Sequence, residues 1–408
     1  MLGKESINTI ILAFLVYLPT CAFVPDYAYL LVLGYSLIAN FSYVKNYILS
    51  LFNRKVTDST LTYLIVFAVI AFVFRLADFE NWSSFKSFYS FAYLFPFTYL
   101  VARTVWLNKK VYDFLVLFIA VESVVGILEY LAGKNSFFTS LNYYREFDSY
   151  NLLYYTRVFG LSVNSSIFSI KLFVGLIILN RTVFSEKIKF IFELLILGVS
   201  ILAFGRIALI AIGVYYFIKA VDVFLVSKQF KKLTFLPFVL FVLFFATNPT
   251  WSKNQFTRNN KAVTAHFIGT EDEGYLTAEE MKDVEFDLTE KLGIGKINMS
   301  GRNQIWNTFV KFGIKNIFVG NKSEKFMLGK VHAHNSYIEV FASFGIVMTT
   351  FLFFIFFRAV NRQNYVVVLS LMILAIGQYF IFWGISFYDI IFYSLLFFDQ
   401  VPVRHEVE

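Results

Sequence analysis

The sequence predicts an all-α polytopic membrane protein with about twelve transmembrane helices and a large, partly helical outer loop. The first observation behind this fold class is composition: hydrophobic residues make up 58% of the 408 residues and charged residues 16%. Soluble globular proteins have about 45–50% and about 25%. A soluble core of this size cannot bury so much apolar surface, because surface area does not fall fast enough with chain length.

The second observation is that the apolar residues gather in stretches of about 20 residues, the length that crosses a bilayer as a helix. We expect spans at 7–24, 27–44, 60–77, 87–107, 111–132, 159–180, 188–204, 206–226, 233–249, 336–357, 364–383 and 385–400. Nine spans therefore occupy 1–249, an outer loop occupies 250–335, and three spans with a cytoplasmic tail occupy 336–408. The connections at Pro25-Asp26 and around Gly205 must be very tight turns.

Lys and Arg in the short loops predict the orientation, because basic residues favour the cytoplasmic side. Alternate connections carry thirteen Lys and Arg, whereas the intervening short connections hold only Lys86 and Arg206. Both termini are therefore expected in the cytoplasm, and 133–158 and 250–335 outside. The net charge of +8 is typical of this loop bias in a membrane protein, so we expect a lipid bilayer and no nucleic acid as partner.

The large outer loop divides by charge. Nine acids and one base lie between Glu271 and Glu290, and eight bases and one acid between Lys291 and Lys330. The acidic run reads most simply as a solvated helix face. The basic half is suited to anionic substrates or to lipid head groups.

A helix is expected in the basic half, starting after the N-cap candidate Ser300 and stopping near Gly313. Its apolar residues recur at helical spacing, so it should lie on the membrane surface or pack on the bundle: Ile305, Trp306, Phe309 and Val310. Arg302 falls in the first turn, where the helix dipole disfavours a cation. A role beyond helix stability, or a simple solvated arginine, accounts for this placement.

Two of the four histidines, His332 and His334, stand just before the tenth expected span. A His-x-His pair is half of a metal site, but a catalytic zinc needs three protein ligands, and no cysteine or carboxylate has suitable spacing. We therefore expect no metal and no cofactor. Histidine acts as acid or base near neutral pH, which suits this position.

These motifs resemble those of the O-antigen polymerase and ligase superfamily, the Wzy-type polysaccharide polymerases and lipopolysaccharide ligases. The resemblance is carried by Ser300-Gly301-Arg302 with Ile305-Trp306, by His332-Ala333-His334-Asn335-Ser336-Tyr337-Ile338-Glu339, and by Phe344-Gly345-Ile346. Two further segments agree with it, Arg157-Val158-Phe159-Gly160-Leu161-Ser162-Val163-Asn164 and Phe204-Gly205-Arg206. Together they cover roughly 155–360. Gly205 replaces the usual serine, and the acidic insert is a second departure.

The resemblance implies a metal-independent glycosyltransferase of the bacterial cytoplasmic (inner) membrane, with its active site facing the periplasm or the outside. Its donor is an undecaprenyl-diphosphate-linked oligosaccharide, and its product is an O-antigen, capsular polysaccharide or exopolysaccharide. Chain-length regulators and flippases are the partner proteins implied. A ligase would differ in using lipid A–core as the acceptor. A transporter of lipid-linked sugars is the alternative from another class, but it needs cations along a path through the bilayer rather than at its outer edge.

The chemistry of a diphosphate leaving group suggests the roles. Arginine matches phosphate bidentately and stays charged, so we expect Arg206 and Arg302 to bind the diphosphate. His334 is the candidate for activating or orienting the acceptor hydroxyl. We further assign substrate binding to four residues: Arg157, His332, Asn335 (which also fixes its turn) and Glu129.

Charges inside the expected spans are costly, so each of them suggests a function or a partner. Glu122 lies near the middle of the fifth span and Lys171 near the middle of the sixth. A buried ion pair between consecutive spans is the simplest account, and a role in substrate binding is the alternative. Glu129, seven residues after Glu122, is near the outer surface, where it could face a sugar.

Overall fold

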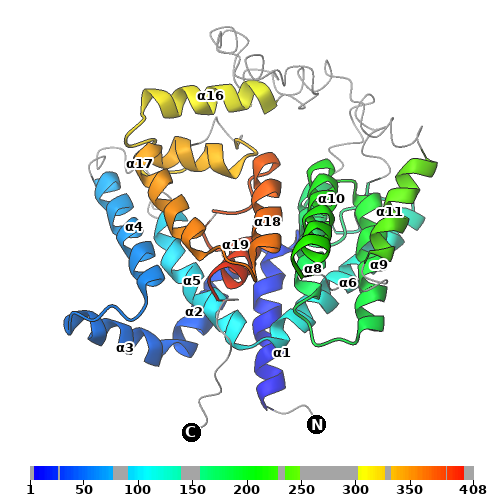
Figure 1. Ribbon diagram of the computed structural model, residues 1–408, viewed down its shortest axis with the longest axis horizontal. Helices are drawn as coiled ribbons and strands as arrows, with labels where there is room; N and C mark the ends of the chain where they lie inside the picture. Colours follow the sequence, from blue (N-terminus) through cyan, green and yellow to red (C-terminus); the bar gives the residue numbers. More distant parts are fainter. Residues whose placement is uncertain are drawn as a thin grey trace.

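A computed structural model gives the structure of the chain for residues 4–25, 28–76, 91–138, 157–227, 235–248, 302–326, 332–382 and 384–398. These residues form helices joined by turns and irregular segments, and none of them forms a strand. The described part of the chain is therefore all-helical (Figure 1). In chain order the helices are α1 (Lys4–Tyr17), η1 (Leu18–Thr20), α2 (Tyr29–Ala39), α3 (Phe41–Phe52), α4 (Ser59–Leu76), α5 (Phe91–Leu107), α6 (Lys110–Leu131), α8 (Ser165–Leu179), α9 (Glu186–Ala203), α10 (Arg206–Val221), η6 (Asp222–Ser227), α11 (Leu236–Thr247), α16 (Arg302–Lys315), α17 (Ser336–Ala359), α18 (Tyr365–Gly377), α19 (Phe387–Tyr393) and η9 (Ser394–Phe398).

Some of the expected features fall outside the described residues. Among them are the acidic run between Glu271 and Glu290, the N-cap candidate Ser300, Lys86 and the cytoplasmic tail. The solvated helix face expected in the acidic run therefore stays a prediction.

Every stretch expected to span contains a helix, but most of these helices are shorter than expected. Four are long and apolar enough to cross a membrane: Ser59–Leu76, Lys110–Leu131, Arg206–Phe224 and Ser336–Ala359. Six further apolar helices in the described residues are shorter. The helices are compatible with a multi-pass membrane protein, whereas the number of twelve spans stays a prediction.

The second expected span, 27–44, is interrupted. α2 ends at Ala39 and α3 starts at Phe41, and α3 runs across the lower end of the bundle in Figure 1. Asn40 lies at the break. Its amide nitrogen donates to Thr104 Oγ1 (2.6 Å), and its oxygen accepts from Arg103 Nη1 (2.6 Å). These contacts with α5 satisfy a buried amide at the point where the chain changes direction.

The tenth expected span, 336–357, is bent. Within α17, Gly345 has φ 70° and ψ −179°, so the first part of the helix lies under α16 and the second part crosses the bundle (Figure 1). The segment after α16 fixes the bend, because Ile346 N donates to Ile317 O (2.6 Å). A Cβ on Gly345 would lie 2.6 Å from the carbonyl carbon of Phe318, and a Cβ on Gly320 would lie 2.5 Å from Gly345 N.

The last two expected spans, 364–383 and 385–400, are also shorter than predicted. α18 ends at Gly377, α19 begins at Phe387, and the described residues between them are non-helical and largely buried. Irregular backbone is tolerated at membrane depth only where protein or a water-filled cavity surrounds it. Asp389 satisfies part of this segment, since its Oδ1 accepts from Phe382 N (2.6 Å) and its Oδ2 from Ser386 Oγ (2.8 Å).

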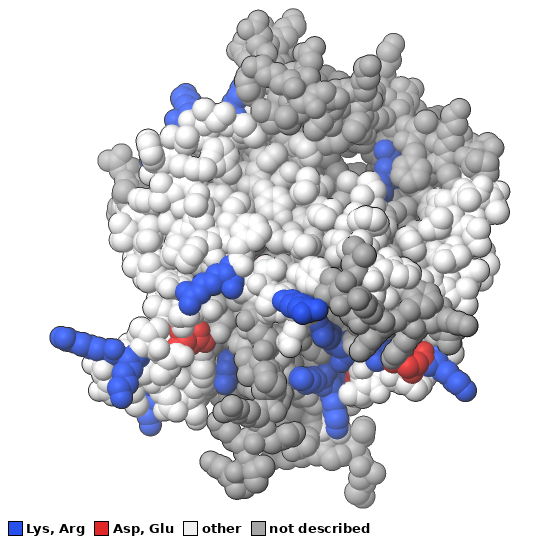
Figure 2. Space-filling view, viewed as in Figure 1, with Lys and Arg blue, Asp and Glu red and all other residues white. Residues whose placement is uncertain are grey.

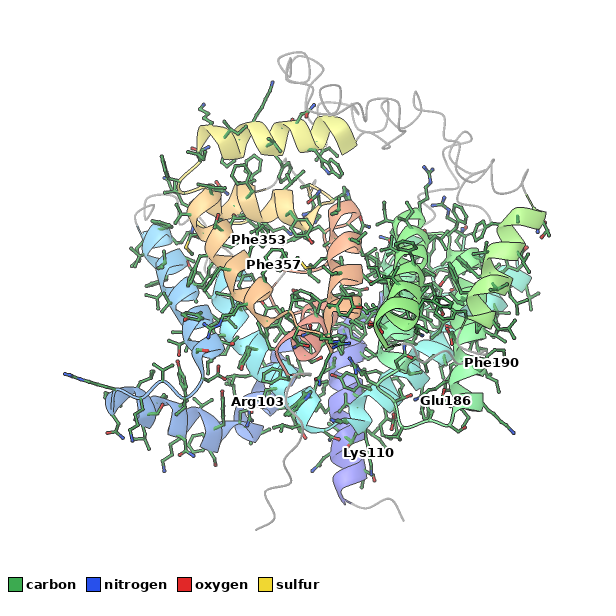
Figure 3. The ribbon with its side chains drawn as sticks, viewed as in Figure 1. Arg103, Lys110, Glu186, Phe190, Phe353 and Phe357 are labelled. Atoms are coloured by element: carbon green, nitrogen blue, oxygen red, sulfur yellow. The ribbon has the colours of Figure 1, made fainter. Side chains whose placement is uncertain are left out.

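The two ends of the bundle differ in charge and architecture. α16 lies across the upper end, and α1 begins at the lower end (Figure 1). Figure 2 shows most of the visible Lys and Arg side chains towards the lower end. Arg103, Lys110 and Glu186 lie there, while Phe353 lies on α17, nearer to α16 (Figure 3). The helix that begins with Arg302 is at the opposite end.

Candidate functional site

The turn at 332–335, called the histidine turn below, leads into α17. Asn335 is the N-cap, because its Oδ1 accepts from Tyr337 N (2.9 Å) and Ile338 N (3.0 Å). His334 has φ 51°, a left-handed conformation that is uncommon for a residue other than glycine. Asn335 therefore fixes this turn, as expected, and the two histidines flank Ala333 within it.

Ala333 joins the histidine turn to two helices. Its N–H donates to Glu339 Oε2 of α17 (2.9 Å), and its carbonyl accepts from Trp306 Nε1 of α16 (2.6 Å). Trp306 is one turn after Arg302, the first residue of α16. The start of α16 is therefore held beside the histidines, although the Arg302 side chain lies outside the part of the chain that the structure describes.

α16 packs on the bundle through its apolar face, which was one of the two expected placements. Ile305 and Phe309 are buried, and they form a cluster with Ala333 and Ala342. The helix does not stop at Gly313 as predicted but continues to Lys315. A Cβ on Gly313 would lie 2.4 Å from the Phe341 ring, so this glycine lets α16 approach α17 closely rather than ending the helix.

Arg206 begins α10 directly after the tight turn from α9, where the chain has Gly205 in place of the serine that the resemblance predicts. Phe204 caps α9 in the left-handed conformation (φ 46°), and Gly205 N donates to Ser169 Oγ of α8 (2.9 Å). A Cβ on Gly205 would lie 2.4 Å from Ser169 Cβ. A serine at 205 therefore does not fit, because the Ser169 side chain fills that space.

The end of α18 connects the Arg206 turn with the histidine turn. Ile207 of α10 lies so close to Gly377 that a Cβ on the glycine would be 2.5 Å from it. The next residue, Gln378, accepts a hydrogen bond on its carbonyl from Ser336 Oγ (3.2 Å). The segments that carry Arg206, Arg302 and His334 therefore meet at one end of the bundle. Convergence of the three side chains on one point stays a prediction.

Arg157 lies in the neighbouring loop at this end, and Glu129 lies in the last turn of α6. Arg157 is buried, and its guanidinium lies 5.4 Å from the Phe204 ring, beside the Arg206 turn. Glu129 is fully buried, and its two oxygens accept from the backbone N–H groups of residues 137, 159 and 160 (2.8–3.1 Å). This carboxylate holds the loop that carries Arg157. Its contact with a sugar stays a prediction.

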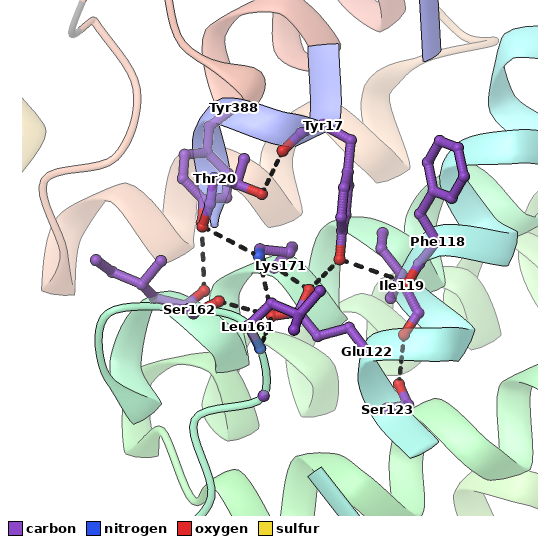
Figure 4. A network of polar contacts seen from close by, with 12 residues as sticks. Tyr17, Thr20, Phe118, Ile119, Glu122, Ser123, Leu161, Ser162, Lys171 and Tyr388 are labelled. Atoms are coloured by element: carbon purple, nitrogen blue, oxygen red, sulfur yellow. Dashed lines mark hydrogen bonds and ion pairs between the residues drawn. The ribbon is translucent and has the colours of Figure 1, made fainter. Parts of the chain in front are cut away.

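The expected pair of Glu122 and Lys171 is present. Lys171 Nζ lies 2.9 Å from Glu122 Oε2, and both side chains are fully buried. Glu122 also accepts from Ser162 Oγ (2.8 Å), from Leu161 N (3.0 Å) and from the Tyr17 hydroxyl. Figure 4 shows the two charges enclosed by these donors. The structural interpretation of the pair is confirmed.

Sequence reasoning missed a polar cluster beneath α16. Lys325 Nζ lies 4.7 Å from the centre of the Tyr379 ring, and the His332 ring lies 5.8 Å from the same ring. Burial lowers the pKa of Lys325 to about 7, although the charge of Glu339 opposes this shift. Burial, with the charges of Lys325 and His334, lowers the pKa of His332 to about 3. His332 is therefore neutral at physiological pH, where it can accept a hydrogen bond but does not take up a proton.

Only part of this cluster could have been predicted from the sequence. Glu339 follows the histidines within the motif, so its helical spacing from Asn335 could have placed it under the turn. Nothing in the sequence marks Lys325 or Tyr379. Among the described residues, no three His, Cys, Asp or Glu side chains gather as metal ligands would.

Comparisons of the chain with protein-family models, with curated proteins and with solved structures find no match. The family resemblance therefore depends on the motifs quoted above.

Proposed function

We propose that the protein polymerises undecaprenyl-diphosphate-linked oligosaccharide repeat units. The supporting observation is that the histidine turn, the start of α16 and the Arg206 turn meet at one end of an apolar bundle, through the Trp306–Ala333 hydrogen bond (2.6 Å) and the Ile207–Gly377 contact. A diphosphate donor and an attacking hydroxyl must approach within a few ångströms, so their binding groups must also be neighbours.

The proposed mechanism divides the work between cations and histidine. The acceptor hydroxyl oxygen forms a bond to the anomeric carbon, and the bond from that carbon to the diphosphate oxygen breaks. The electron pair leaves with the diphosphate, whose growing charge is stabilised by fixed arginines. Arg206 and Arg302 take this role, with Arg157 beside them. His334 orients the hydroxyl and accepts its proton, which it releases to water after transfer.

We propose the bacterial cytoplasmic membrane as the location, with both termini inside and α16 outside. The gathering of Lys and Arg at the end opposite α16 (Figure 2) supports this orientation. Cysteines placed at the exposed residues Lys315 of α16 and Lys109, with the buried Cys21 replaced by serine, test it. A membrane-impermeant maleimide should label position 315 in whole cells and position 109 only after lysis. The reverse pattern refutes the orientation and the face of the site.

The function is tested by incubating the purified protein with lipid-linked repeat units and measuring polymer length. Arg206→Lys keeps the charge but loses the planar fork, so polymer formation should fall at least tenfold. His334→Ala should reduce turnover with little change in donor binding. Arg358→Lys, at the other end of α17, is the matched control and should behave as wild type.

The acceptor and the product decide between the alternatives. Transfer only when lipid A–core is supplied identifies a ligase. Movement of the lipid-linked unit across a proteoliposome membrane without any new glycosidic bond identifies a transporter. Polymer of full length from His334→Ala removes histidine from the mechanism.

A further inference from the structure

The first turn of α17 carries a buried carboxylate of which only one oxygen accepts a hydrogen bond from the described part of the chain. Glu339 is fully buried, and its Oε2 accepts from Ala333 N (2.9 Å). Its other oxygen, Oε1, is buried and has no hydrogen-bond partner among the described residues. A buried acceptor left without a donor is costly, and the cost is greater for a charged group than for a neutral one.

A second acceptor in the same condition lies on the adjoining segment. Gln378 Oε1 is buried without a partner among the residues that the structure describes. Ser336, about one turn before Glu339 on α17, contacts this segment by donating from Oγ to the Gln378 carbonyl (3.2 Å). While Glu339 is ionised, each of these oxygens is an acceptor, so a group that satisfies either of them must donate a hydrogen bond.

The surrounding charges restrict the chemistry of that donor. A phosphate or carboxylate is disfavoured, because it would bring further negative charge towards Glu339 Oε1. A metal cation or an ammonium group is disfavoured by the Lys325 side chain, whose charge acts on Glu339. A neutral hydroxyl satisfies both conditions, since it donates one hydrogen bond and can accept another.

We propose that Glu339 Oε1 binds a hydroxyl group of a neutral sugar, with Lys325 and His332 beside it. This inference rests on the proposed function: the sugar is the acceptor end of the growing chain, and the site adjoins the histidine turn. The hydrogen bond from Ala333 to Glu339 then couples the position of the two histidines to occupation of the site. A sugar that binds here brings its neighbouring hydroxyl groups to the turn that carries His334.

The test measures sugar binding separately from polymerisation. Full-length protein in nanodiscs is titrated with methyl glycosides of the monosaccharides found in the source cell's polysaccharide, which carry no diphosphate. Stabilisation of the folded protein reports binding. Glu339→Gln puts an amide N–H₂ in place of the acceptor Oε1. Glu339→Asp keeps the charge, but its shorter side chain moves the carboxylate away from the proposed sugar hydroxyl. Glu193→Gln is the control, because Glu193 also accepts a side-chain hydrogen bond, from Tyr216, and lies outside the site.

We expect a glycoside to bind wild type and Glu193→Gln equally, and to bind both Glu339 variants at least tenfold more weakly. The unliganded melting temperature of each variant shows whether it is folded, and Glu339→Asp serves where Glu339→Gln does not fold. The inference is overturned if the Glu339 variants bind a glycoside as tightly as wild type does. It is also overturned if wild type binds no glycoside, in which case only water fills the site.

Wild-type polymerisation, measured in parallel, decides the proposed function. A wild type that binds glycosides through Glu339 but makes no polymer keeps the site and refutes the function. A wild type that makes polymer but binds glycosides equally well without Glu339 keeps the function and refutes the site.

Discussion

Removing either member of the Glu122–Lys171 pair should destabilise the protein, and the two losses should be unequal. In Lys171→Met, Glu122 keeps hydrogen bonds from Ser162 Oγ (2.8 Å), Leu161 N (3.0 Å) and the Tyr17 hydroxyl. The carboxylate remains solvated by protein donors. We expect a loss of about 3 kcal/mol in the free energy of unfolding, the lower end for breaking a buried pair.

Glu122→Met should cost more. Lys171 then retains the Thr20 carbonyl (3.3 Å) and the Tyr17 ring (5.0 Å), which compensate a buried ammonium poorly. The donors that faced Glu122 also lose their acceptor, at about 1–3 kcal/mol each. A loss of about 5 kcal/mol or more follows, a size that an uncompensated buried charge is among the few mechanisms able to reach.

The double variant separates this explanation from simple packing. With both charges gone, only the neutral donors remain unsatisfied. The loss of unfolding free energy in the double variant should therefore be smaller than the sum of the two single losses by about 3 kcal/mol. Unfolding in detergent micelles, followed by denaturant titration, measures each corner of the cycle. The pair of the half-buried Lys189 with the exposed Glu186 (3.6 Å) is the control and should couple by less than about 0.5 kcal/mol. Additive losses at Glu122 and Lys171 would refute the pairing as the source of stability.

Three further perturbations test the architecture. Gly205→Ser should lower the unfolding free energy by about 1–3 kcal/mol through overpacking, and adding Ser169→Gly should recover most of that loss; no recovery contradicts the steric explanation. Gly345→Ala should cost about 3 kcal/mol in the same assay because its φ of 70° strains any side chain, whereas Gly198→Ala, with open space at its Cβ, should cost nothing. Lys325, with its pKa lowered to about 7, should be acylated with a midpoint near that pH in a mass-spectrometric labelling series. Because the unfolded chain holds this proton up to higher pH, the unfolding free energy should rise with pH above about 7. A labelling midpoint above about pH 9, close to the pKa of an ordinary lysine, contradicts the shift.

Local chemistry made parts of the site predictable. The sequence shows the amphipathic face of α16 because Ile305 and Phe309 recur at helical spacing. It also shows the turn at Asn335, because this residue accepts a hydrogen bond from Ile338 N, only three residues further along the chain. The pairing of Glu122 and Lys171 followed from the cost of isolated charges in a membrane. Each of these inferences needs only neighbouring residues or a general energy penalty.

The missed features depend on contacts between distant segments. The break at Asn40 is stabilised by Thr104 of α5, 64 residues further along the chain, and an apolar run gives no sign of it. The same holds for the bend at Gly345, which depends on the segment after α16, and for the shortened α18 and α19. Lys325 reaches the site only because that segment returns to α17. Such contacts have no local periodicity to reveal them.

Gly320 and Gly345 together limit how this chain can change over evolutionary time. The backbone at Gly320 packs directly against the backbone at Gly345, so nearby side chains can vary widely without weakening this contact. A new side chain at either glycine cannot be accommodated by rotating a neighbour, since the obstructing atoms are backbone. Substitution at one position therefore has to be accompanied by a change in the length or path of the connecting segment. Relatives that preserve this joint should keep both glycines, and relatives that lose one should differ in loop length as well.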